Sequence, residues 1–238
     1  MESHPRRVAT RRSNMTRQII VADDHPQFRD ALKSAVAQTA SDLVFVEADT
    51  VAVLLGALES HGSAALLLLD LNMPGAQGFN ALAYVHGRYP AVPVVIISAD
   101  DDPQTVAAAL RYGAQGFIAK STESGQIGQA VATVLDGGTC LPVGFQVPRA
   151  TDSGTEGLAI ARRIAHLTPP QFRVLGMLCA GLHDRQIASE LDTPEVTVAT
   201  HVTAILRQLD VATRTQAVLA AGRLAVDRAS VKPLPEEA

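Results

Sequence analysis

The chain has 238 residues, 47% of them hydrophobic but only 4% aromatic, and a net charge of −4. This length allows two modest domains, whose cores must be built mainly from Leu, Val, Ile and Ala. No apolar run approaches the roughly 20 residues of a membrane span, so the sequence predicts no membrane partner. The two cysteines, Cys140 and Cys179, lie far apart without a CxxC motif. They are expected to be free thiols, as in a cytoplasmic protein.

The charge is distributed unevenly along the chain. Residues 18–140 contain 5 Lys/Arg and 13 Asp/Glu, whereas residues 158–225 contain 7 and 5. An acidic front and a mildly basic back suit a cation site joined to a polyanion binder. Residues 1–17 carry five Arg and one Glu. They are predicted to form a disordered basic arm, or to lie partly upstream of a true start at Met15; contact with DNA phosphates is the functional alternative.

Four apolar segments are predicted to be strands of one parallel sheet. They are 18–22, 64–69, 94–97 and 116–119, and they run into Asp23-Asp24, Asp70, Ser98 and Lys120. Continuous apolar strands indicate a sheet covered on both faces, and such sheets build their sites at the carboxyl edge. Three carboxylates, a hydroxyl and an amine at one edge indicate a site for one phosphoryl group and one hard cation. The alternative, that the carboxylates merely cap loops, is reasonable for one Asp but less so for the set.

Helix signals between these strands complete the first domain. Pro26 and the pair Asp102-Pro103 are typical of helix starts, and Gly113 is typical of a helix end. Gly75 and Gly78 allow a tight turn after Asp70. The alternation predicts five βα units around a parallel sheet with right-handed crossovers.

These features resemble the receiver domains of response regulators over roughly residues 18 to 138. The resemblance rests on Asp23-Asp24, on Asp70-Leu-Asn-Met-Pro-Gly75, on Ser98, and on Gly113-Ala-Gln-Gly-Phe-Ile-Ala-Lys120. It implies a doubly wound five-stranded parallel sheet of the flavodoxin-like kind, over residues 18–140. It further implies the following roles: Asp70 as phosphoacceptor, Ser98 and Lys120 on the phosphoryl oxygens, and Mg²⁺ held by Asp23, Asp24, Asp70 and the backbone carbonyl of Asn72.

The physical chemistry agrees with these roles. Mg²⁺ prefers carboxylate and phosphate oxygens, and phosphoryl transfer needs mainly positioning and charge neutralisation. Phe117 stands where the family carries an aromatic that changes rotamer. It is expected to turn inward when the Ser98 hydroxyl is drawn to the phosphate; a buried Phe that never moves is the alternative.

Residues 141–163 have the Pro, Gly, Ser and Thr content of a linker, with the hinge expected at 141–157. Residues 164–226 are predicted to form a small all-α domain, followed by a tail at 227–238. Thr168 and Pro169 begin its first helix and Gly181 ends it; a short second helix starts at Asp184. With Thr193 as the cap of a third helix reaching Leu209, the pattern is a helix-turn-helix.

On the third helix, one face is apolar and is expected to pack on the core: Val198, Val202, Ile205 and Leu209. The opposite face would enter the major groove of double-stranded DNA. This part resembles the LuxR/NarL-type DNA-binding domain through Leu167-Thr-Pro-Pro-Gln171, Arg185-Gln-Ile-Ala188, Thr197-Val-Ala-Thr-His-Val202 and 209–216. The candidate DNA contacts are Arg185, Thr197, Ala199, Thr200, Thr203, Arg207 and Arg214. The resemblance also implies a fourth helix from Arg214 to about Leu224, which often forms a homodimer contact.

Several positions depart from the family pattern. Ala199 and Gln208 stand where Lys is common, Thr203 where a basic residue is frequent, and Phe172 where Glu is usual. Each lost cation removes one potential phosphate contact, which weakens binding. The sequence therefore predicts unusual or weak DNA specificity.

The sequence thus predicts a non-enzymatic, two-component transcription factor, phosphorylated on Asp70 by a histidine kinase and binding DNA as a homodimer. One alternative is a regulator whose output domain acts by protein contact or without phosphorylation. A phosphatase using Asp70 as nucleophile is a second alternative. It is disfavoured because Asn72 stands where such enzymes need a second carboxylate.

Overall fold

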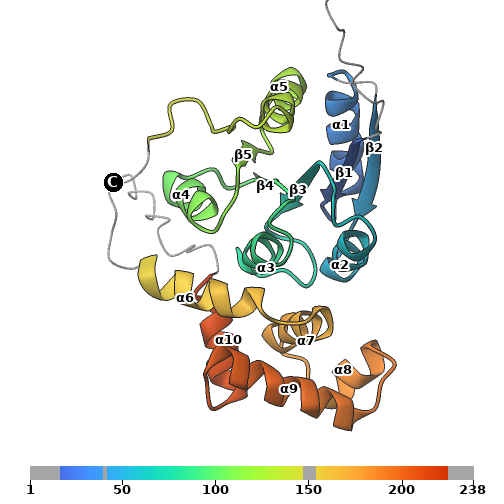
Figure 1. Cartoon of the computed structure of the whole chain (residues 1–238), viewed down its shortest axis with the longest axis vertical. Helices are drawn as coiled ribbons and strands as arrows, with labels where there is room; N and C mark the ends of the chain where they lie inside the picture. Colours follow the sequence, from blue (N-terminus) through green and yellow to red (C-terminus); the bar gives the residue numbers. More distant parts are fainter. Residues whose placement is uncertain (1–16, 40–41, 147–153, 225–238) are drawn as a thin grey trace, which may run out of the picture.

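The computed structural model describes residues 17–39, 42–146 and 154–224, which form a receiver-like α/β domain and a helical output domain (Figure 1). The predicted arm at 1–17 (apart from Arg17) and the tail at 227–238 lie outside the described residues. Among those residues, no helix combines the length and apolarity needed to cross a membrane.

The first domain is a five-stranded parallel sheet in the order β2-β1-β3-β4-β5. Its strands are β1 (Arg17–Ala22), β2 (Leu43–Ala48), β3 (Leu66–Asp70), β4 (Val94–Ser98) and β5 (Gly116–Ala119). The helices between and after them are α1 (Pro26–Ala37), α2 (Val51–Ser60), α3 (Asn80–Arg88), α4 (Pro103–Arg111) and α5 (Ser124–Leu135). The predicted fold class is confirmed.

Alternating side chains of the central strands fill two cores, one on each face of the sheet. Leu66 and Leu68 pack with residues of α1 and α5, and Leu67 and Leu69 pack with residues of α2, α3 and α4. Because neither face meets water, every residue of β3 is buried, Asp70 included. The phosphoacceptor candidate is therefore held at the end of the most enclosed strand.

The predicted helix boundaries are largely confirmed. Pro26 is the first residue of α1, and Asp102 caps α4 by accepting from the backbone N–H groups of Gln104 and Thr105 at 2.8 and 3.2 Å. Gly75 has φ +85°, a conformation that side chains rarely adopt, so the turn after β3 requires glycine there.

The second part of the structure is entirely helical. It contains α6 (Gly154–Ala165), α7 (Pro169–Cys179), α8 (Asp184–Glu190), α9 (Glu195–Leu209) and α10 (Arg214–Gly222). Helix α6 lies largely within 141–163, the interval predicted as a linker. The linker composition extends into the first turn of this helix, at Gly154, Thr155 and Gly157, so the hinge predicted at 141–157 overlaps α6. The rest of the helix carries the apolar side chains Ile160 and Ile164, both buried.

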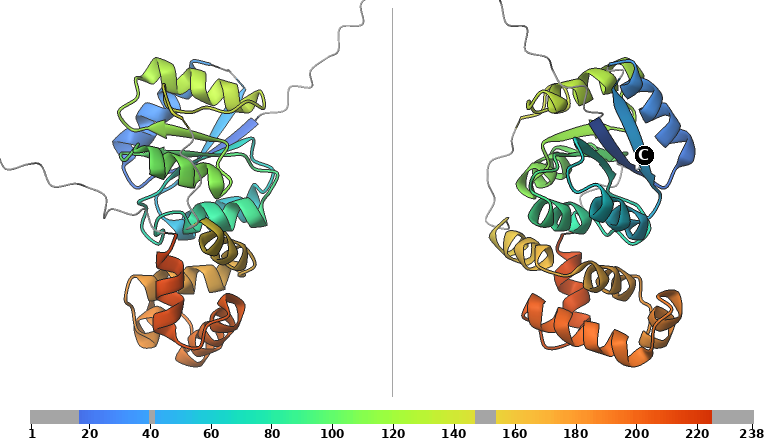
Figure 2. Two further views of the ribbon diagram at one scale, coloured as in Figure 1. Left: turned by 90° about the vertical axis from the view of Figure 1, so that its left-hand side faces the viewer. Right: turned by 45° about the vertical axis from the view of Figure 1, so that its right-hand side comes forward.

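The two parts pack against each other along α3. Helices α6 and α7 lie between the receiver sheet and α9 in all three views (Figures 1 and 2). The ring of Tyr84 on α3 stacks on that of Phe172 on α7, with centroids 4.2 Å apart, and the Phe79 N–H donates to the Leu224 carbonyl at 2.8 Å. One continuous apolar cluster joins the receiver core to the output domain.

Candidate functional site

The carboxyl edge of the sheet brings together the chemical groups that the sequence analysis placed there. Asp23 follows β1, Asp70 and Ser98 are the last residues of β3 and β4, and Lys120 follows β5. Parallel strands in register end at the same edge, so four segments far apart in sequence deliver these side chains to one place.

Lys120 is the central cation of this site. Its Nζ lies 2.7 Å from Asp23 Oδ2 and 2.9 Å from Asp70 Oδ2, and both carboxylate side chains are at most 2% exposed. Burial raises the pKa of Asp70, although Lys120 opposes that shift. Burial alone would lower the pKa of Lys120, but hydrogen bonds with Asp23 and Asp70 outweigh it, so the pKa is raised. Lys120 is thus a firmly protonated counterion to two buried carboxylates.

The acidic groups are spaced as a cation site requires. Asp23, Asp24, His25 and Asp70 each offer one ligand atom, and these atoms lie within 4.8 Å of one another. Three of the four donors are hard carboxylate oxygens, which suit Mg²⁺. The Asn72 N–H donates to Asp70 Oδ1 at 3.2 Å, which turns the chain after Asp70 back toward the carboxylate. The donor set fits the predicted Mg²⁺ site.

Ser98 and Phe117 lie on the neighbouring strands, both 1% exposed. The Ser98 hydroxyl oxygen accepts from the Asp100 N–H at 3.1 Å, while the Ser98 carbonyl accepts from the Lys120 N–H at 2.8 Å. The Phe117 ring is packed in the core shared with α3 and α4. The structure therefore shows the inward position of this ring, and its movement stays a prediction.

Three residues of the site were not identified from the sequence. His25 Nδ1 lies 2.6 Å from Asp24 Oδ1, Phe28 places its ring centroid 5.0 Å from Lys120 Nζ, and Arg29 donates to the Asp23 carbonyl at 2.7 Å. Their short distance from Asp23 in the sequence could have identified them. All three stand within six residues of Asp23, where the first turn of α1 lies at the sheet edge.

The second candidate site is the helix-turn-helix formed by α8 and α9 on α7. The predicted core face of α9 is buried, with Val198, Val202, Ile205 and Leu209 at most 9% exposed. The helix ends at Asp210, which has a left-handed backbone conformation. One prediction was wrong: Pro194, not Thr193, is the residue that precedes α9, and no side chain caps it. Its fixed φ sets the entry to the helix without a hydroxyl.

The opposite face of α9 points to solvent and carries the predicted DNA contacts. Thr200, Thr203, Ala199 and Arg207 are exposed, and Thr197 is half-buried. The Thr200 and Thr203 hydroxyls donate to carbonyls one turn earlier, both at 2.9 Å, which leaves their methyl groups and lone pairs for a partner.

The other two predicted contacts differ in their surroundings. Arg185 on α8 is exposed, whereas Arg214 at the start of α10 forms an ion pair with Asp184. Gln208, expected to mark a lost phosphate contact, is half-buried and donates from Nε2 to the Arg163 carbonyl on α6 at 3.5 Å, at the limit for a hydrogen bond. That position lies against α6, not on the exposed face, because α6 covers the C-terminal half of α9.

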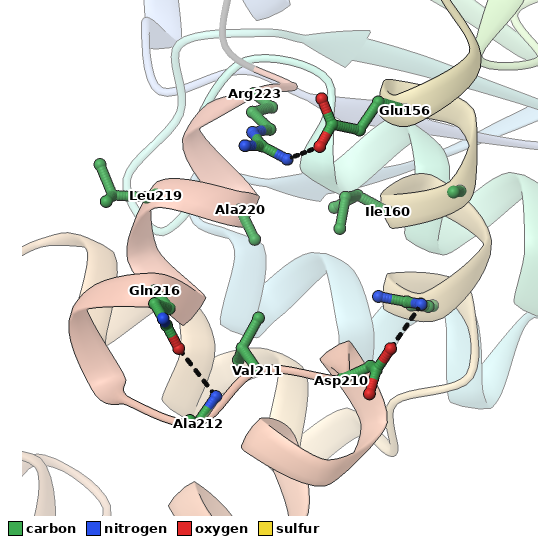
Figure 3. A pocket seen from close by; sticks show the side chains of 11 residues that line it. Glu156, Ile160, Asp210, Val211, Ala212, Gln216, Leu219, Ala220 and Arg223 are labelled. Carbon is green, nitrogen blue, oxygen red and sulfur yellow. Dashed lines mark hydrogen bonds and ion pairs between the residues drawn. The ribbon is translucent and has the colours of Figure 1, made fainter.

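Helix α6 belongs structurally to the output domain. Arg163 pairs with Asp210 at 2.9 Å, and Arg223, the residue that follows α10, pairs with Glu156 (Figure 3). These residues line an open hollow of about 510 Å³ between α6 and α10. Since α6 also packs on α3, any movement of the output domain carries α6 with it or breaks these ion pairs.

Comparison with known proteins gives two family matches. Residues 19–132 match the response regulator receiver domain, and residues 165–221 match the bacterial regulatory proteins of the luxR family.

Among its relatives, the glycerol metabolism activator of Pseudomonas putida is 38% identical over 208 residues, covering 86% of this chain and 94% of that protein. A probable transcriptional regulatory protein NarL of Mycobacterium tuberculosis is 34% identical over 209 residues, covering 86% and 93%. A solved structure of the RcsB response regulator of Salmonella typhimurium has a TM-score of 0.51 at 20% identity and covers 86% of this chain and 97% of that one. That likeness concerns the fold alone.

Proposed function

Since the chain belongs to the NarL/LuxR-type response regulators, with a receiver domain and a LuxR-type DNA-binding domain, we propose that it is a phosphorylation-controlled transcription factor. Asp70 accepts a phosphoryl group from a histidine kinase, and the exposed face of α9 reads double-stranded DNA. The carrying observation is the site itself: Asp70, 1% exposed, held between Lys120 and a cluster of carboxylates at the sheet edge.

The chemistry of the first step follows from this arrangement. An oxygen of the Asp70 carboxylate forms a bond to phosphorus while the bond to the donor's nitrogen or oxygen breaks, and the leaving group takes that electron pair. Lys120 stays protonated, and its ammonium can follow the charge from the carboxylate to the phosphoryl oxygens. Ser98 lies on the adjacent strand as a further hydrogen-bond partner.

A divalent cation would be held by Asp23, Asp24, Asp70 and the backbone carbonyl of Asn72, and it would neutralise charge on the transferred group. The protein's own contribution is to keep these oxygens close despite their repulsion. Lys120 offsets part of that repulsion.

For the output, the exposed α9 face and Arg185 are the proposed DNA contacts, and α10 is the proposed homodimer contact. Leu219 on α10 is 64% exposed, which leaves an apolar side chain for such a partner. The protein is proposed to act in the cytoplasm, where both a histidine kinase's catalytic part and DNA are accessible.

Intact mass after incubation with Mg²⁺ and acetyl phosphate tests the first step. One phosphoryl adduct is expected in the natural sequence and none in Asp70→Asn. DNA binding of both forms, followed by electrophoretic mobility over a salt series, tests the second step. Absence of an adduct in the folded protein contradicts the phosphorylation proposal. Steady release of phosphate from a small aryl phosphate ester would instead support the phosphatase alternative.

A further inference from the structure

The turn that follows the phosphoacceptor strand touches the output domain directly. A Cβ added to Gly176, in the middle of α7, would lie 2.8 Å from the Gly75 carbonyl oxygen. That distance is shorter than a carbon and an oxygen tolerate without movement. The backbone of α7 therefore rests on the last residue of Asp70-Leu-Asn-Met-Pro-Gly75, and only glycine permits this approach.

The same turn is held from its other side by α2. The Val51 N–H donates to the Pro74 carbonyl at 3.0 Å, and a Cβ on Gly75 would lie 3.2 Å from Val51 Cβ. The turn is thus clamped between the N-terminus of α2 and the middle of α7. Any displacement of Asn72 to Gly75 must push against one of these two helices.

Contacts along α3 keep α7 in this place. The stack of Tyr84 on Phe172 lies next to the turn, and further along α3 a Cβ on Gly87 would lie 2.2 Å from Ala165 Cβ on α6. The close approach at Gly87 and the aromatic stack at Tyr84 together determine how α3 is aligned along α6 and α7. Phe172, which departs from the family's usual Glu, is what allows the stack.

The packing nevertheless contains groups that favour separation. Asn80 Oδ1 and the Tyr84 hydroxyl are buried without a hydrogen-bond partner, and Asn80 lines a small gap at this interface together with Gly75 and Gly176. Buried polar groups without partners cost free energy that hydration would recover. When the interface opens, water can hydrate Asn80 and Tyr84, and this hydration offsets part of the free energy lost with the apolar contacts. The closed packing is therefore less stable than its apolar contacts alone would make it.

The closed packing does not cover the proposed DNA-reading face. Val196, at the start of α9, is 71% exposed, and Thr200 and Arg207 are exposed as well. The contact made by the output domain on the receiver falls instead on α3 and on the turn beside Asp70. We therefore expect the contact between the domains to affect Asp70 and not access to the exposed face of α9.

We propose that Gly176 is a positioning residue through which the output domain restrains the turn after β3 and slows phosphoryl transfer to Asp70. This rests on the proposed function of Asp70. In the closed packing both Asp70 oxygens are engaged, one by Lys120 at 2.9 Å and one by the Asn72 N–H at 3.2 Å. The Asn72 N–H belongs to the clamped turn, so the turn helps to fix the orientation of the Asp70 carboxylate. Reorientation of that carboxylate toward a phosphoryl donor must therefore move a turn that is held on both sides. To the extent that the closed packing also lowers the stability of the phosphorylated state, phosphorylation favours separation of the domains, because coupling between two equilibria is reciprocal.

Gly176→Ala in the full chain tests this, because its methyl group forces α7 away from Gly75. The rate of adduct formation with Mg²⁺ and acetyl phosphate is measured by intact mass, and the radius of gyration by small-angle scattering before the donor is added. Gly56→Ala on α2 is the matched control, since its Cβ would meet nothing within 4 Å. Gly176→Ala is expected to be more expanded and to react about fivefold faster or more. The control should match the natural sequence.

Gly87→Ala provides a second opening of the interface, at Ala165 and away from the turn. It is expected to accelerate the reaction too, which shows that domain separation and not a local defect in α7 is responsible. Circular dichroism verifies that each variant is folded. Expanded variants that react at the natural rate overturn the proposal, as do variants that remain as compact as the natural chain. No adduct in any variant, the natural sequence included, contradicts instead the proposed function itself.

Discussion

Replacing Lys120 by alanine is expected to destabilise the metal-free protein strongly, because it leaves two carboxylates buried together. Asp23 and Asp70 are at most 2% exposed and lie 2.7 and 2.9 Å from Lys120 Nζ. Breaking a buried ion pair from one side typically costs about 3–5 kcal/mol. Water entering the space left by the side chain favours the low end, so we expect about 3 kcal/mol near pH 8.

The loss should depend on pH in a defined direction. Burial raises the pKa of Asp70 and Lys120 opposes this, so the variant should raise that pKa further. A carboxyl with a higher pKa in the folded state binds more protons when folded, and its contribution to stability falls as pH rises through the folded pKa. Destabilisation by Lys120→Ala is therefore expected to be smaller at about pH 5 than at about pH 8.

Thermal unfolding without Mg²⁺, followed by circular dichroism, measures this effect. About 3 kcal/mol corresponds to a decrease in Tm of about 10 °C for a domain of this size. Lys33→Ala is the matched control: Lys33 also contacts two carboxylates, Asp30 and Glu47, but these are 74% and 40% exposed. Such surface pairs contribute about 1 kcal/mol or less. Equal losses for the two variants, or a Lys120→Ala loss that does not change with pH, would refute the reasoning.

Three further outcomes follow from the structure. Millimolar Mg²⁺ should raise the Tm of the natural sequence but much less that of Asp24→Asn, because one carboxylate ligand is lost; an equal rise would exclude Asp24 from the site. In fluorescence anisotropy with duplex DNA, Ala199→Lys should tighten binding and steepen the salt dependence by about one unit, whereas Gln208→Lys, half-buried against α6, should not. Burial raises the pKa of Cys140 and of Cys179 to about 11, so iodoacetamide at neutral pH should label neither until the protein unfolds, as mass spectrometry can check.

The sheet edge was predictable because it depends on local patterns that tertiary contacts do not override. The continuous apolar segments that run into Asp70, Ser98 and Lys120 are β3 to β5. Because these strands are parallel and in register, their ends bring the three side chains to the same edge of the sheet. The second strand was not located from sequence. In β2 only Ala48 is buried, and its four apolar residues, Leu43 to Val46, are followed by Glu47 and not by a residue that the sequence analysis assigned to the site.

The interface between the domains could not be predicted either. Its contacts depend on the absence of side chains at Gly75, Gly87 and Gly176 and on one aromatic pair, and none of these has a sequence period. Gly75 was recognised as a turn residue, yet its carbonyl also meets α7. A glycine that permits close approach looks the same in sequence as one that permits a turn.

The output domain has fewer arginines free to contact DNA than its sequence suggests. Residues 158–225 contain seven Arg, but three of these neutralise acidic residues within the domain: Arg163 with Asp210, Arg214 with Asp184, and Arg223 with Glu156. Few cations therefore remain to displace counterions from DNA, and the affinity for DNA should depend weakly on salt concentration.

Discrimination between DNA sequences must then come mostly from the threonine and valine side chains on the exposed face of α9, through methyl contacts and hydrogen bonds to base edges. Such a domain gains little from non-specific attraction. Pairing two copies on adjacent half-sites would supply the affinity that a single copy lacks.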